Sequence, residues 1–63
     1  MKALESLIRE KETYARHDEN PVLQAMEFDS IAKAILYVSK DATMLTAEEI
    51  SATDWAKKRL GVV

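Results

Sequence analysis

The chain has 63 residues, a formal net charge of −2 and an isoelectric point near 5.3. This length allows one domain, spanning residues 1–63, which would bury only about 60% of the surface that its unfolded chain exposes. With no cysteine and a single histidine, the sequence excludes disulfides and thiolate or histidine-rich metal sites. Oligomerisation is then the remaining common means of stabilising so small a chain, and well-idealised packing of a monomer is the alternative.

The sequence also bears on location and on binding to nucleic acid. No apolar run approaches the roughly 18 residues of a membrane span, and the start of the chain lacks the pattern of a secretory signal. We therefore expect a cytoplasmic protein. Its net negative charge disfavours a function that depends on binding the phosphate backbone of a nucleic acid.

Apolar residues at helical spacing predict a first amphipathic helix over about residues 2–17. The stripe comprises Leu4, Leu7, Ile8, Lys11, Tyr14 and Ala15. Asn20 is a good N-cap, and Pro21 then occupies the first position of the next helix, where its missing N–H costs nothing. A tight turn between two antiparallel helices follows from this pattern.

The second helix is expected over about residues 21–40. Its main apolar stripe comprises Phe28, Ile31, Ile35 and Val38, flanked by Ala25, Ala32 and Leu36. The opposite side is not cleanly polar, because Val22, Met26 and Tyr37 lie on it. A helix that is apolar on several sides tends to be buried on several sides, which favours a homodimer. Alternatively, the first and third helices cover both sides within one chain.

Thr46 and Glu49 have the spacing of a capping box, and Gly61 is a typical helix stop, so a third helix is expected over about residues 47–60. Thr53 could instead begin a separate short helix, because its side chain favours caps over helix interiors. The predicted fold is all-α. It is an antiparallel helical hairpin with a short C-terminal helix, forming a homodimeric helical bundle.

No group of residues predicts catalysis. The neighbouring acids, Glu10 with Glu12 and Glu48 with Glu49, are explained by a solvated face and by the capping box. A glycine-rich phosphate-binding loop is absent from the sequence. We expect no enzyme activity, no cofactor and no metal.

Two sets of residues are candidates for binding. The first is a protein interface, for which aromatic residues and methionine are the usual anchors. Its members are Val22, Met26, Phe28, Ile31, Ile35, Tyr37 and Trp55. The second is the basic cluster Lys57, Lys58 and Arg59, which beside an aromatic could contact a phosphate backbone. The alternative for this cluster is a helix end matched to the helix dipole, with the Trp55 ring packed into the core.

The sequence resembles two kinds of known protein. In length and hairpin architecture it resembles Rop-type dimers, which form antiparallel four-helix bundles. Over the whole chain, and above all over Glu19–Ala32, it resembles the short helical early proteins of lambda-like temperate phages, encoded between the exonuclease and excisionase genes. This resemblance implies an accessory regulator in the host cytoplasm. Such a protein acts by protein contacts on host functions or on the lysis–lysogeny decision.

The function expected from these observations is a non-enzymatic protein-interaction module that binds its own copy and an unknown host or phage protein. The alternatives are a small DNA-binding transcriptional regulator that uses the basic C-terminal helix, and an antitoxin-like partner protein.

Overall fold

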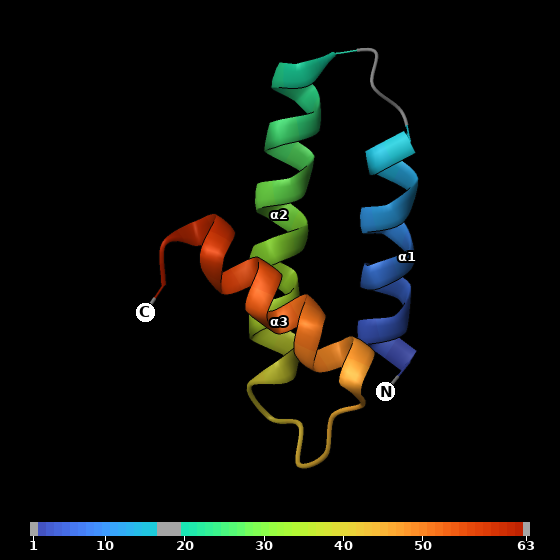
Figure 1. The fold of residues 1–63 in the computed structure, drawn as a ribbon, viewed down its shortest axis with the longest axis vertical. Coiled ribbons are helices and arrows are strands. Elements are labelled where there is room, and N and C mark those ends of the chain that lie inside the picture. The colour runs from blue at the N-terminus through green and yellow to red at the C-terminus, as the bar shows by residue number, and fades with distance from the viewer. Residues whose placement is uncertain (1, 17–19, 63) are drawn as a thin grey trace.

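Residues 2–16 and 20–62 are described by the structure, a computed structural model, and they form three α-helices (Figure 1). Their bounds are Lys2–Arg16 for α1, Pro21–Ser39 for α2 and Ala47–Leu60 for α3. α1 and α2 run antiparallel as a hairpin, and α3 crosses obliquely over α2 (Figure 1). The predicted all-α class and hairpin are confirmed. The last residue of the predicted first helix, His17, lies outside the described residues.

The start of α2 is fixed by its cap. Asn20 is extended, and its side-chain oxygen accepts hydrogen bonds from the backbone N–H groups of Val22 at 3.0 Å and Leu23 at 3.2 Å. Two of the otherwise unpaired donors at the start of the helix are thereby satisfied. Pro21 follows at the first helical position, as predicted.

Both ends of α3 are also set locally. The hydroxyl of Thr46 accepts from the N–H of Glu49, whose carboxylate accepts from the N–H of Thr46, so the predicted capping box is confirmed. Gly61 ends the helix with a φ of 71°, a left-handed conformation that glycine adopts without steric cost. Between them α3 is uninterrupted, and the alternative of a separate helix beginning after Thr53 is wrong. The Thr53 hydroxyl stays within the helix by donating to the carbonyl of Ile50 at 2.8 Å.

The hydrophobic core lies where the three helices meet. Its buried members are Leu4 and Ile8 from α1, Ile31, Ala32 and Ile35 from α2, and Ala52 and Ala56 from α3. The contribution of α3 consists of alanines, whose small side chains let its backbone approach α2 closely. Tyr14, Phe28 and Trp55 are partly buried and pack against this core.

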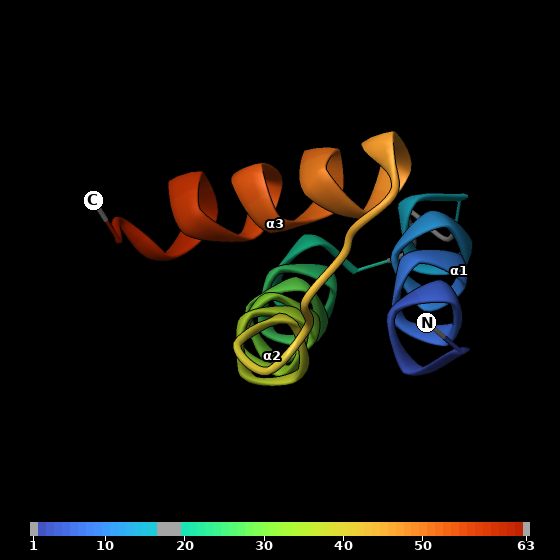
Figure 2. The same cartoon turned by 90° about the horizontal axis from the view of Figure 1, so that it is seen from below.

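α2 is the central helix, but it is not fully enclosed. Seen along the hairpin, α1 lies beside α2 and α3 lies across an adjacent side, while the remaining side of α2 is uncovered (Figure 2). The alternative that α1 and α3 cover both apolar sides of α2 is not met, because they cover the main apolar stripe but leave Val22, Met26 and Tyr37 exposed. Among the described residues, no helix combines the length and the hydropathy needed to cross a membrane.

Candidate protein-interaction surface

The uncovered side of α2 carries four large apolar side chains. We define the outer face of α2 by Val22, Leu23, Met26, Ser30, Lys33 and Tyr37, all of which are exposed. The exposed fractions of the apolar members are 69% for Val22, 57% for Leu23, 61% for Met26 and 77% for Tyr37. Residues four apart share one side of a helix, so these side chains form a stripe and not a scatter.

The contacts of α2 explain why this face stays open. Gln24 points toward α1, where its amide nitrogen donates to the carbonyl of Tyr14 at 2.8 Å. Phe28 points toward α3 and meets the Trp55 ring edge to face, with ring centroids 5.8 Å apart and planes at 82°. The two covered sides of α2 are thus occupied, and the outer face of α2 is the arc that neither α1 nor α3 reaches.

The structure divides the predicted interface residues into three groups. Val22, Met26 and Tyr37 lie on the outer face of α2. Phe28 and Trp55 are half-buried and pack against each other. Ile31 and Ile35 are only 4% and 0% exposed, and they pack in the core of the chain itself. Their predicted role as interface residues is therefore wrong, since α1 and α3 already cover the main apolar stripe.

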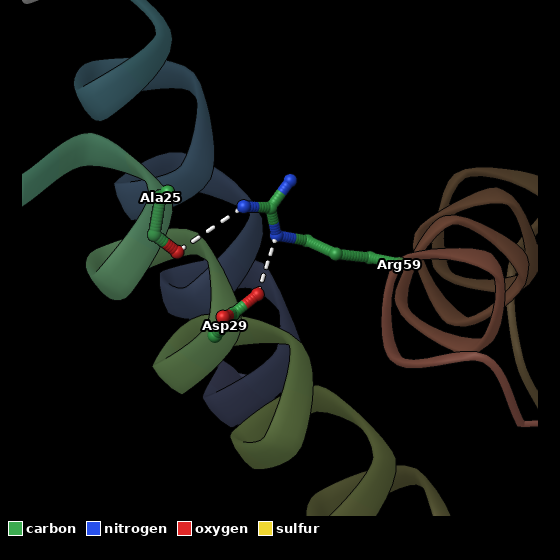
Figure 3. A network of polar contacts seen from close by, with 3 residues as sticks. All are labelled: Ala25, Asp29 and Arg59. Carbon is green, nitrogen blue, oxygen red and sulfur yellow. Dashed lines mark hydrogen bonds and ion pairs between the residues drawn. The ribbon is translucent and has the colours of Figure 1, made fainter. Parts of the chain in front are cut away.

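Arg59 makes contacts that the sequence analysis did not anticipate (Figure 3). Its Nε donates to Oδ1 of Asp29 at 2.9 Å, and its Nη2 donates to the backbone carbonyl of Ala25 at 3.1 Å. The guanidinium also lies over the Phe28 ring, 5.2 Å from the centroid. The Arg59 side chain thus links the last turn of α3 to the middle of α2.

The contacts of Arg59 with α2 set it apart from Lys57 and Lys58, the other two members of the predicted basic cluster. Lys57 and Lys58 are exposed, whereas two of the five guanidinium N–H donors of Arg59 are already bonded to α2. On the other side of α3, the Lys11 ammonium lies 4.8 Å from the centroid of the Trp55 ring. Trp55 is half-buried between Phe28 and Lys11, which agrees with its predicted packing against the core.

A polar hollow lies between α1 and the start of α3. Its charged lining comprises Glu5, Arg9, Glu12, Glu48 and Glu49. Glu49 is 3% exposed, and the backbone N–H of Thr46, which donates to it, holds its pKa below the ordinary value. A depressed pKa suits a structural carboxylate and not a general acid at neutral pH. Within residues 2–16 and 20–62, no three His, Cys, Asp or Glu residues are grouped so that they could hold a metal ion.

Two features of the surface escaped the sequence analysis. Leu23 belongs to the outer face of α2. Its position around the helix axis can be predicted from the sequence, but whether α1 covers that position cannot. The pair of Asp29 and Arg59 is separated by 30 positions, and no local pattern signals a contact of that kind. Both depend on where neighbouring helices lie.

Comparison of the chain with known protein families, with curated proteins and with solved structures found no match.

Proposed function

We propose that this chain is a protein-interaction module that binds another protein chain through the outer face of α2 and carries out no chemistry of its own. The observation that supports the proposal is the gathering of four large apolar side chains, each more than half exposed, on one side of the central helix. Single exposed apolar residues are common on proteins, whereas several gathered on one side of a helix, as Val22, Leu23 and Met26 are, indicate an interaction surface.

The composition of this face suits protein recognition. Val22, Leu23 and Met26 are contiguous at one end, and Tyr37 lies about four turns away at the other. Methionine adapts its shape to a partner, and tyrosine offers a large ring with a polar tip. Ser30 and Lys33 lie between the two apolar ends, where their side chains can make polar contacts with a partner.

The resemblance to early phage proteins gives this proposal a biological setting. A phage or prophage accessory regulator would use such a face to bind another protein chain, and this origin remains a prediction. The genes beside the coding sequence test it. Recombination or excision genes are expected, whereas an adjacent toxin gene would favour an antitoxin-like partner protein.

Photo-crosslinking tests the proposed function. A benzophenone amino acid placed at Met26 should form adducts with a protein in the producing cell. The same group at Asp54, an exposed position on α3, should not. Val22→Glu should abolish the adducts from position 26, because it places a charge within the same apolar stripe. Identical adducts from both positions, or none from position 26, would contradict the proposal.

A further inference from the structure

We propose that the partner of the outer face of α2 is a second copy of this chain, with the two α2 helices antiparallel and the two-fold axis passing between Asp29 and Ser30. The inference rests on the proposed function and specifies its partner. Two observations support it: the spacing of the residues along the outer face of α2 and the order of the charges along α2.

Two pairs of residues on the outer face of α2 are placed symmetrically about this axis, and one of the pairs is apolar. Val22 and Tyr37 are equally far from it in sequence, as are Met26 and Lys33. In an antiparallel pair, the partner's Tyr37 therefore lies over Val22, and the aliphatic stem of the partner's Lys33 lies over Met26. The same patch serves both copies, as a two-fold interface requires.

The charges on α2 favour the antiparallel arrangement. Asp29 and Lys33 are one turn apart, and the Asp29 side chain remains 53% exposed although it binds Arg59. Antiparallel pairing places the partner's Lys33 about one helical turn from Asp29, within reach of its flexible stem. Two reciprocal ion pairs result. The two Asp29 carboxylates approach each other near the axis, where each is neutralised by its own Arg59.

A parallel pair in register would have the opposite effect. Lys33 would then lie beside the partner's Lys33, so that two positive charges would meet across the interface. Tyr37 would lie beside the partner's Tyr37. The apolar residues Val22, Leu23 and Met26 would cluster at one end. The separation of the two Lys33 ammonium groups therefore favours the antiparallel arrangement, whereas Asp29 lies about one helical turn from the partner's Lys33 in both arrangements.

The size of the face sets the expected affinity. Stable dimers bury about 800 Å² on each partner. The chain exposes 4790 Å² in all. One face of the 19-residue α2 is about 28 Å long and about 10 Å wide, so it supplies only part of the area that a stable dimer needs. We therefore expect a weak dimer with a dissociation constant on the order of 10 to 100 μM.

Sedimentation equilibrium on the purified chain, from about 1 to 500 μM, tests the association. The wild type should pass from monomer to dimer over this range. Met26→Glu should remain monomeric at all concentrations, and Lys33→Glu should raise the dissociation constant at least about fivefold. Asp54→Lys, an exposed change on α3, is the matched control and should behave as the wild type. All three positions are exposed, and circular dichroism verifies that each variant is folded.

Introduced cysteines test the geometry, because the chain contains none of its own. Ser30→Cys places thiols beside the two-fold axis and should give a disulfide-linked dimer on mild oxidation. Lys40→Cys places them roughly 30 Å apart in the antiparallel pair and should not. Equal crosslinking at both positions would indicate a parallel pair and overturn the inference.

The outcomes separate this inference from the proposed function. A chain that is monomeric at 500 μM, but crosslinks to a different protein from position 26 in cells, would overturn the second copy as partner and leave the proposed function standing. A chain that is monomeric and forms no adduct from position 26 would overturn both.

Discussion

Replacement of Arg59 by alanine should lower the free energy of unfolding by about 1 to 2 kcal/mol. The ion pair with Asp29 contributes only about 0.5 kcal/mol, because the side chains of Arg59 and Asp29 are 28% and 53% exposed. The hydrogen bond to the carbonyl of Ala25 has a charged donor and contributes about 1 kcal/mol at this exposure. The contact with the Phe28 ring adds about 0.5 kcal/mol.

This loss is large for so small a chain, whose total stability is about 3 to 9 kcal/mol at typical values per residue. Urea denaturation followed by circular dichroism measures it. Lys58→Ala is the matched control, since it removes a positive charge from the same turn of α3 but no contact to α2, and it should cost less than about 0.5 kcal/mol. If Arg59→Ala and Lys58→Ala cost the same, the contacts of Arg59 with α2 do not stabilise the fold and the reasoning fails.

Three further predictions concern the core, the capping box and the basic cluster. Ile35→Ala, at a fully buried position, should cost about 2 to 5 kcal/mol and leave much of the chain unfolded by circular dichroism. The pKa of Glu49 is lowered by folding, so its stabilising effect is complete above the ordinary value of 4.5 and is lost as the pH falls through the folded-state pKa. Urea midpoints measured between about pH 6 and pH 3 should therefore fall less steeply for Glu49→Gln, and equal slopes would exclude this role. Finally, micromolar protein should leave the gel mobility of DNA unchanged at low salt, and a shift abolished by Lys57→Glu would favour the DNA-binding alternative.

The elements of the fold could be predicted from the sequence because their signals are local. Asn20 with Pro21, and Thr46 with Glu49, specify helix starts through contacts no more than three residues apart. Gly61 marks the end of α3 through its own backbone conformation. Such signals act within a single turn of chain, and a sequence displays them directly.

The assignment of faces could not be predicted in the same way. The helical pattern of α2 showed that apolar residues lie on several sides, but it did not show which side α1 and α3 would leave open. Ile31 and Met26 are both apolar residues of α2, yet one is 4% exposed and the other 61%. That difference depends on how helices far apart in the sequence pack against one another. The ion pair between Arg59 and Asp29 depends on the same packing.

The position of α3 has a consequence for the way the chain opens. α3 crosses the half of α2 nearer its C-terminal end (Figure 1). The buried Leu4 lies in the first turn of α1 and the buried Ile35 in the C-terminal half of α2, so both belong to that end of the antiparallel hairpin. Within the described residues, no helix crosses over the opposite end, where α1 ends and α2 begins, although the Arg59 side chain of α3 reaches the carbonyl of Ala25 there. Amide hydrogens of residues 22–27 should therefore exchange with solvent through local opening, while those of residues 31–38 exchange only on global unfolding. Because the first of these segments carries most of the apolar outer face of α2, slower exchange there would report a bound partner without any label.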